Sequence, residues 1–253
     1  MKITLLGTGT SQGIPVIACS CDVCTSGDPR DSRLRSSVMV EDEDNVLVID
    51  TGPDFRQQML AHKVKGLTGV LFTHEHKDHV AGLDDVRAFN FILKRRIDVY
   101  AENRVQEALR REYAYIFAEE KYPGVPQIEM HLIENREFTI GRTRILPVRI
   151  YHYELPIFGF RIGNFAYLTD VKSVPDEELY KLYDLEVLIL TALRKKEHVS
   201  HMNLDEAIDL VAKIKPGKTY LTHLSHAFGL HAVEEAHLPD HIRIGYDGLS
   251  FEF

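Results

Sequence analysis

The chain has 253 residues, of which 44% are hydrophobic and 27% charged, and this composition excludes a disordered, collagen-like or coiled-coil protein. Its formal net charge of -8 argues against a protein that holds nucleic acid mainly through attraction to phosphates. Its length suits one or two domains at about 150 residues each. Because no low-complexity linker or long charge run divides the chain, we expect residues 1–253 to form a single α/β domain.

Short β-branched runs bounded by Gly or Asp predict strands in both halves of the chain. The expected strands are Ile3–Leu6, Ser37–Val40, Val46–Ile49, Val70–Phe72, Ile145–Ile150, Phe158–Ile162, Phe165–Leu168, Val187–Leu190 and Thr219–Leu221. Helical apolar periodicity between them predicts the helices Asp54–His62, Leu83–Phe91, Arg104–Phe117, Asp176–Tyr183 and Asn203–Ile214. Strands that alternate with helices in both halves indicate an α/β fold with mixed sheets.

The N-terminus and the cysteines indicate the compartment. The apolar run in MKITLLGTGT reaches Gly7 too early for the core of a signal peptide. No stretch approaches the roughly 18 to 20 apolar residues that span a bilayer. The three cysteines all lie within six residues, which excludes a disulfide framework with long closed loops. We therefore expect a cytoplasmic protein that does not associate with membranes.

Thirteen histidines are the unusual feature of the composition, and three of them lie in the segment THEHKDH, residues 73–79. Side chains two positions apart in extended backbone point the same way, so His74 and His76 can converge on one ion. Asp78 and His79, at the following turn, can face a second ion about 3.5 to 4 Å away. One isolated histidine would be an ordinary loop residue, but three His and one Asp within six residues favour a metal site.

This HxHxDH pattern resembles the metallo-β-lactamase superfamily, and the resemblance extends over the whole chain. Further stretches match in order: Gly7-Thr8-Gly9, Ile49-Asp50-Thr51-Gly52, His152, Thr169-Asp170 and Thr222-His223. The resemblance implies an αββα sandwich, in which helices flank two mixed β-sheets and the metals lie at one edge of the sheets. It also implies seven ligands for two ions: His74, His76 and His152 for one, Asp78, His79 and His223 for the other, and Asp170 as the bridge between them.

Three of the matched residues have ordinary alternatives. His152 ends an apolar run and would by itself be a partly buried histidine, and Asp170 ends a strand, where a turn-forming Asp is the default. The order and spacing of both relative to the HxHxDH pattern favour their role as ligands. Asp50 is expected either to orient a ligand imidazole or to cap a turn, without contacting metal.

Two positions bear on the class of reaction. By resemblance, the lactam-cleaving branch with two zincs has Cys where this chain has Asp170, and the diiron flavoprotein branch has Glu where it has His76. Both differences point toward hydrolases of phosphodiesters or thioesters.

A second cluster, CSCDVC at residues 19–24, offers three thiolates at CxCxxC spacing, one ligand short of a closed tetrahedral site. The segment THLSHAFG provides His226 in addition to His223. The combination resembles the phosphoribosyl 1,2-cyclic phosphate phosphodiesterases of the bacterial carbon–phosphorus lyase pathway, and the stretches GTGTSQGIP, HMNLDEA and GYDG match them as well. The resemblance implies a structural zinc bound by Cys19, Cys21, Cys24 and His226; three packed free cysteines are the alternative.

The same resemblance implies a mechanism. Two metals would generate a hydroxide nucleophile and bind the phosphodiester oxygens, and the leaving alkoxide would still need a proton. His201, in HVSHMNLDEA, matches the histidine that donates this proton, and it precedes a helix whose N-terminal end suits a phosphate. His198 is the alternative donor, and a solvated loop residue is the alternative role of His201. We therefore predict a metal-dependent phosphodiesterase that acts on a small phosphodiester of the cyclic ribose phosphate type.

Several alternatives stay open. The fold also serves tRNA 3' processing nucleases, glyoxalase-type thioesterases and a carrier of pyrroloquinoline quinone biosynthesis that shares the CxCxxC cluster. The chain lacks the basic arm expected of the nuclease, so we expect a small phosphodiester and no stable nucleic-acid binding. At the catalytic pair, imidazoles favour Zn, whereas carboxylates and a phosphate substrate suit Mn. Lys94–Arg96 and Arg111–Gly124 could form a lid or a homodimer face, or a solvated turn and an ordinary amphipathic helix.

Overall fold

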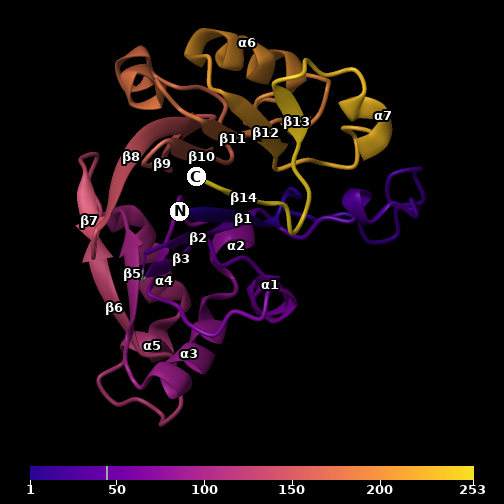
Figure 1. Ribbon diagram of the computed structural model, residues 1–253. Helices are drawn as coiled ribbons and strands as arrows, with labels where there is room; N and C mark the ends of the chain where they lie inside the picture. The colour runs from indigo at the N-terminus through magenta and orange to yellow at the C-terminus, as the bar shows by residue number, and fades with distance from the viewer. Residues whose placement is uncertain (44) are drawn as a thin grey trace.

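The computed structural model describes residues 1–43 and 45–253. Within them, two seven-stranded mixed sheets face each other, and helices cover both outer faces (Figure 1). The expected αββα sandwich of the metallo-β-lactamase fold is therefore confirmed. None of the helices in these residues has the length and apolar composition needed to cross a membrane.

The first sheet has the strand order β14-β1-β2-β3-β4-β5-β6. Its strands are β1 (Lys2–Gly7), β2 (Ser37–Asp42), β3 (Asn45–Ile49), β4 (Gly69–Leu71), β5 (Ile97–Ala101), β6 (Ile128–Leu132) and β14 (Ser250–Glu252). The helices of this half are η1 (Pro29–Asp31), α1 (Phe55–Ala61), α2 (Lys77–Val80), η2 (Leu83–Val86), α3 (Arg87–Leu93), α4 (Asn103–Glu112) and α5 (Ala114–Phe117). Strands β3 to β6 run parallel to one another, so their carboxyl ends share one edge of the sheet.

The second sheet has the order β13-β12-β11-β10-β9-β8-β7. Its strands are β7 (Phe138–Ile140), β8 (Thr143–His152), β9 (Leu155–Ile162), β10 (Phe165–Leu168), β11 (Val187–Thr191), β12 (Lys218–Thr222) and β13 (Ile242–Ile244). The helices of this half are η3 (Asp176–Leu182), α6 (Leu204–Ile214) and α7 (His231–Glu235). In Figure 1, α6 and α7 lie above this sheet, whereas α1 and α3 to α5 lie below the first one.

Alternation along the strands separates three apolar layers, because successive side chains point to opposite faces of a sheet. Leu47 and Ile49 of β3 lie in the layer between the two sheets, with Phe158 and Phe160 of β9. The intervening Val48 joins the layer beneath the helices of the first sheet. The hydrophobic effect therefore holds the two halves together through this central layer.

The structure confirms each expected strand, except that β4 ends at Leu71, and it adds β5, β6, β7, β13 and β14. The single helix expected over Arg104–Phe117 is wrong, because the backbone of Tyr113 leaves the helical region and separates α4 from α5. The Tyr113 hydroxyl donates to the Val80 carbonyl, at the end of α2. The helix expected over Asp176–Tyr183 is a 3-10 helix.

A buried ion pair attaches η3 to the second sheet and gives a stability prediction. Glu178 accepts hydrogen bonds from Lys181 Nζ, Asn135 Nδ2 and the Arg149 backbone, and both charged side chains are buried. Glu178→Gln leaves Lys181 without its counter-charge, so we expect a loss of about 3 kcal/mol in the free energy of unfolding. Urea titration measures this loss. Asp176→Asn, which breaks the exposed pair with Lys213 beside it, is the control and should change little.

The same pair predicts a pH dependence. Burial alone would raise the pKa of Glu178, but Lys181, Asn135 and the Arg149 N–H outweigh it and hold the pKa below its usual value. The contribution of Glu178 is therefore present above the unfolded pKa near 4.5 and is lost as the pH falls through the lower folded value. The stability difference between wild type and Glu178→Gln should narrow below pH 4.5. A constant difference from pH 7 to pH 3 would contradict this account.

Candidate metal centres

The seven residues predicted to bind two metals lie together at one edge of the sandwich. His74, His76, Asp78 and His79 follow β4 and enter α2, whereas His152 ends β8. Two further ligands, Asp170 and His223, follow β10 and β12. The parallel strands of each sheet end at this edge, so the topology brings segments from positions 74 to 223 into contact.

Asp170 lies at the centre of the cluster. Its Oδ1 is 3.3 Å from His79 Nε2 and 3.0 Å from His223 Nδ1, whereas its Oδ2 is 3.8 Å from His74 Nε2. Asp170 belongs to three groups of candidate ligands, and within each group the ligand atoms lie within 4.8 Å of one another. The members are Asp78, His79 and His223 in the first, His74 and His76 in the second, and His152 and His201 in the third. One carboxylate thus faces both halves of the cluster, which is the geometry of a bridging ligand.

Three of the ligand histidines, His74, His79 and His152, use their Nδ1 atoms outside the cluster, whereas His223 turns its Nδ1 toward Asp170. His79 Nδ1 donates to Asp50, and His152 Nδ1 donates to the Ser200 carbonyl. His74 Nδ1 donates to Thr73 Oγ1, whose hydroxyl donates in turn to Asp50. Asp50 therefore orients the imidazoles of His79 and, through Thr73, of His74, which is one of the two roles expected for it. The Nε2 atoms of these two histidines face the cluster.

The donor set fits divalent ions. Among the described residues, the buried Nε2 atoms of His74 and His79 have no hydrogen-bond partner. Unpaired buried imidazole nitrogens are costly unless an ion occupies the space between them. The mixture of imidazoles and carboxylates is suited to Zn or Mn.

Burial and neighbouring charges shift the pKa values of the residues in the cluster. Burial lowers the pKa of His74 well below its usual value, and the neighbouring His79 contributes. Burial alone would also lower the pKa of His79, but Asp78, Asp170 and Asp50 outweigh it and raise that pKa well above the usual range. Burial would raise the pKa of Asp170, yet His223 and His79 hold it well below the usual value. The carboxylates are therefore ionised and available as ligands.

Three residues of this edge have left-handed backbone. The φ angles of Asp50, Asp170 and His223 are 65°, 58° and 57°, and each residue follows a strand. Asp and His tolerate this region better than most residues, but it costs conformational energy. The sharp turn directs each side chain along the sheet edge toward the cluster.

His201 contacts the cluster, whereas His198 lies further out. The ring of His201 is 4.5 Å from that of His152 and 4.9 Å from that of His223, and 5.2 Å from that of His198. Burial lowers the pKa of His201 to about 3. Met202 donates its backbone N–H to the Val171 carbonyl, which fixes His201 beside Asp170. Asn203 and Glu206 form a capping box that begins α6 immediately afterwards.

The second predicted site is also assembled. The Sγ atoms of Cys19, Cys21 and Cys24 lie 3.2, 3.4 and 3.6 Å from His226 Nδ1. Ligand atoms about 2.0 to 2.3 Å from one tetrahedral ion are roughly 3.3 to 3.8 Å apart, so the four residues fit one zinc. The Cys24 N–H and the neighbouring thiols lower the pKa of Cys21 to about 6, whereas burial and the same neighbours raise that of Cys24 to about 11. Such a set favours thiolate ligation once a metal is present.

Residues 45–224 match the family described as "Beta-lactamase superfamily domain". A crystal structure described as "a New Diphosphatase from the PhnP Family" is 40% identical, with a TM-score of 0.93, and the match covers 100% of this chain and 97% of that one. The chain belongs to the PhnP family of the β-lactamase superfamily. Because the family, the fold and the candidate metal sites agree, the chain is a metal-dependent hydrolase.

Two further relatives limit what the PhnP-family assignment says about the substrate. An octanoyltransferase of Porphyromonas gingivalis is 41% identical over 252 residues, which cover 98% of this chain and 51% of the relative. The chain therefore spans about half the length of that curated relative. Zn²⁺-bound PqqB from Methylobacterium extorquens superposes with a TM-score of 0.80 at 18% identity over the whole of both chains, which shows a shared fold.

Several residues that support this PhnP-family site could not be predicted from the sequence, because their partners are far away in the chain. Arg33 donates to Gly245 O and Thr8 Oγ1 and contacts His231 Nδ1, while the Asp31 carboxylate accepts from the His231 backbone. These contacts attach the segment between β1 and β2 to α7, where Figure 1 shows it extending to the side of the sandwich. Only the GYDG match near Gly245 hinted at this region.

A second supporting residue holds the HxHxDH segment. Arg104, on α4, forms an ion pair with Glu75, between two ligand histidines, and donates to the Pro156 carbonyl at 2.7 Å. The basic turn Lys94–Arg96 lies elsewhere: Arg95 donates to Leu67 O, before β4 begins, at the opposite end of this strand from the cluster. That position does not suit a lid over the metals.

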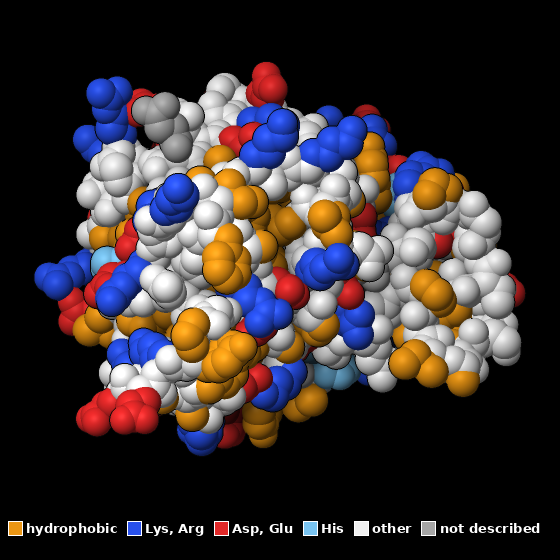
Figure 2. All heavy atoms as spheres, turned by 90° about the horizontal axis from the view of Figure 1, so that it is seen from below, with side chains coloured by type: hydrophobic (Ala, Val, Ile, Leu, Met, Phe, Trp, Pro, Cys, Tyr) orange, Lys and Arg blue, Asp and Glu red, His pale blue; other side chains and the backbone are white. Residues whose placement is uncertain are grey.

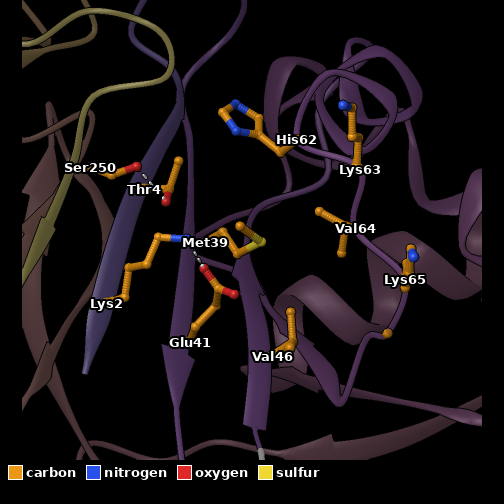
Figure 3. Close-up of a pocket in the computed structure, with 11 residues that line it drawn as sticks. Lys2, Thr4, Met39, Glu41, Val46, His62, Lys63, Val64, Lys65 and Ser250 are labelled. Atoms are coloured by element: carbon orange, nitrogen blue, oxygen red, sulfur yellow. Dashed lines mark hydrogen bonds and ion pairs between the residues drawn. The ribbon is translucent and has the colours of Figure 1, made fainter.

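Two of the hollows that lie away from the cluster differ from it in their lining residues. In the pocket of Figure 3, about 300 Å³, Lys2 pairs with Glu41 and Thr4 with Ser250, so the polar groups of the strands bind one another. Figure 2 shows the side of α1, α3 and α5, where hydrophobic and charged side chains are interspersed. A groove of about 220 Å³ between α1 and α3 includes the exposed side chains of Leu60 and Ile92. Neither hollow has the chemistry of an active site.

Proposed function

We propose that this metal-dependent hydrolase cleaves a P–O bond in a small phosphodiester, with two divalent ions at the seven-residue cluster and one structural zinc at the cysteines. The observation that carries the proposal is the position of Asp170 between the two halves of the cluster, with His201 beside it. A paired metal site binds two phosphoryl oxygens, and an adjacent imidazole can act on the leaving group.

The residues of the site would bind metal, orient the ligands and transfer a proton. By the resemblance, His74, His76 and His152 would hold one ion, Asp78, His79 and His223 would hold the other, and Asp170 would contribute to both. The ions, when bound, supply Lewis acidity and lower the pKa of water. Asp50 and Ser200 fix the imidazoles of His79 and His152, so that the ligand nitrogens need no rearrangement. His201 would pass a proton to the departing oxygen once the negative charge of a bound phosphate has raised its pKa from about 3, and His198 is the alternative donor.

Two substrate classes compete within the proposal. The phosphoribosyl 1,2-cyclic phosphate resemblance favours a cyclic ribose phosphodiester, whose leaving group is an alkoxide. The PhnP-family relative described as a diphosphatase favours a phosphoric anhydride, whose leaving group is a phosphate. An alkoxide needs a proton far more than a phosphate does, so dependence of the rate on His201 distinguishes the two.

Acyl transfer is not part of the proposal. The octanoyltransferase name belongs to a relative twice as long as the matched region. All three cysteines of this chain lie in the proposed zinc site, which leaves no other thiol for a covalent acyl intermediate. A thioesterase of glyoxalase type is tested directly by lactoylglutathione.

The testing experiment combines elemental analysis with an activity panel. The purified protein is assayed on a cyclic ribose phosphate, a dinucleoside diphosphate, bis-p-nitrophenyl phosphate, pre-tRNA and lactoylglutathione, with Zn and Mn supplied separately. Hydrolysis of the small phosphate substrates, lost on chelation and restored by one of the metals, is the expected result. Hydrolysis of the thioester alone would overturn the proposal. Sedimentation in the same preparation tests whether the chain forms a homodimer.

Metal stoichiometry tests the division into two sites. Cys21→Ser should lose one zinc per chain and lower the thermal midpoint of unfolding, because the binding free energy of a structural zinc stabilises the folded state. The metals at the His/Asp cluster should stay. Elemental analysis of wild type and variant, purified without chelator, measures this directly. If wild-type protein carries no zinc that depends on the cysteines, the structural site is wrong.

A further inference from the structure

A pocket opens beside the metal cluster, at the turn between β8 and β9. It is a shallow hollow of about 490 Å³ that is open to solvent and is lined by His76, His152, Tyr153, Glu154, Leu155 and Ser200. We propose that this pocket binds the uncharged, hydroxyl-bearing ring of the substrate, the ribose of a sugar phosphate or of a nucleoside phosphate, with Tyr153 packing on the ring and Glu154 accepting from its hydroxyls. The inference rests on the proposed function, because the substrate phosphate must sit at the metals.

The charge of the lining decides what the pocket can take. Two lining residues, His76 and His152, belong to the cluster, so a group in the pocket is attached directly to the reacting phosphate. Of the described residues that line the pocket, none is Lys or Arg, and Glu154 contributes a carboxylate. A second phosphate there would be repelled, since like charges at short range raise the energy of both. The pocket therefore suits the neutral part of the substrate.

Tyr153 is held at the pocket by strained backbone. Strands β8 and β9 pair from Ile145 with Ile162 to His152 with Leu155, so that Tyr153 and Glu154 alone form the turn. The φ angle of Tyr153 is 56°, a conformation that an aromatic residue adopts at a cost, and 56% of the side chain is exposed. An exposed ring kept in an unfavourable conformation next to ligand His152 indicates a contact with substrate.

The turn is also rigid. Tyr151 accepts from the Lys172 N–H at 2.7 Å and donates its own N–H to the Ser173 carbonyl at 2.9 Å, and His152 Nδ1 donates to Ser200 O at 2.8 Å. These bonds connect the end of β8 to the two segments that carry Asp170 and His201. The backbone of Tyr153 therefore keeps a fixed position relative to the metal ligands, which lowers the entropic cost of packing a sugar or base against the side chain.

Glu154 supplies the polar half of the recognition. Its carboxylate makes no hydrogen bond or ion pair with another residue in the described part of the chain. A carboxylate is an acceptor only, and the adjacent hydroxyls of a ribose are the neutral donors that dinucleotide-binding proteins bind in the same way. A substrate that lacks hydroxyls, such as a methyl phosphate ester, would leave Glu154 unpaired and gain nothing from it.

Calorimetric binding of reaction products to the metal-loaded protein tests the inference. The probes are methyl phosphate, ribose 5-phosphate and uridine 5'-monophosphate. We expect wild type to bind ribose 5-phosphate about tenfold more tightly than methyl phosphate, the scale of one hydrogen bond to a charged group. Glu154→Gln and Tyr153→Asn should each reduce this ratio toward one. Asn tolerates a positive φ, so Tyr153→Asn removes the ring without adding backbone strain.

The other comparisons distinguish the two kinds of substrate, and they distinguish an error in the pocket assignment from an error in the proposed function. If uridine 5'-monophosphate binds more tightly than ribose 5-phosphate, and Tyr153→Asn abolishes this difference, the substrate is a nucleoside phosphate. Equal affinity for the two ribose compounds indicates a sugar phosphate. Either result supports the proposed role of the pocket. Tyr180→Asn, at an exposed tyrosine on η3, is the matched control and should keep the wild-type ratio. Unchanged ratios in both pocket variants would overturn the inference. Absence of phosphate hydrolysis in the activity panel would instead overturn the proposed function.

Discussion

Replacing Asp170 by alanine is expected to abolish turnover and to reduce the metal bound per chain. The carboxylate lies close to ligand atoms on both sides of the cluster, 3.3 Å from His79 Nε2 and 3.8 Å from His74 Nε2. Without it, two cationic centres would face each other with no bridging charge, and one ion should be lost or displaced. Elemental analysis together with turnover of a phosphodiester substrate measures both effects.

The control for this variant is a second aspartate with the same backbone. Asp184 also has a φ angle of 58°, but it is exposed and belongs to none of the candidate metal groups. Asp184→Ala should therefore carry a similar backbone cost and keep full activity. Asp170→Ala protein that folds, retains both metals and turns over normally would show that Asp170 is only a turn residue at the end of β10.

The second large effect is expected at His201. If His201 protonates the leaving group, His201→Ala should retain every metal and lose roughly 10² to 10⁴ in rate on substrates with a poor alkoxide leaving group. A p-nitrophenolate departs without a proton, so the deficit should shrink markedly on the activated diester. Comparing kcat on the two substrates, at measured metal content, checks the prediction.

His198 provides the comparison. It lies one ring beyond His201, and His198→Ala should have a smaller effect on either substrate. A loss confined to His198→Ala would move the proton donor three residues upstream. Equal losses of His201→Ala on both substrates would mean that His201 binds the phosphate, and loss of a metal would make it a ligand, as its place beside His152 and Asp170 allows.

Much of the architecture could be predicted because it depends on local patterns. The β-branched runs of β1, β2, β3 and β8 to β12 have the alternation or continuous hydrophobicity of strands that are buried in a sandwich. The capping box of Asn203 and Glu206 marks the start of α6 within four residues of sequence. The short strand β7 and the edge strands β13 and β14 were missed, because three residues carry too little periodicity.

The candidate ligands could likewise be chosen from the sequence, since HxHxDH and CxCxxC place several metal-binding groups within a few residues. The supporting contacts could not. Arg104 reaches Glu75 across 29 positions, Arg33 reaches His231 across 198, and the Asp50 contact to His79 spans 29. Each residue belongs to a common type in an unremarkable local pattern, and its partner is defined only when the sheets and helices have packed.

The sequence by itself determined which residues are capable of the chemistry: the histidines and carboxylates after the strands, and the three thiols near the N-terminus. Only the tertiary structure decided where each nitrogen points, that Asp170 faces both halves of the cluster, and that Tyr153 and Glu154 line the pocket beside it. The physical reason is the range of the interactions. Side-chain chemistry and strand periodicity are local properties, whereas a ligand's orientation depends on hydrogen bonds to residues that only the packed core brings near.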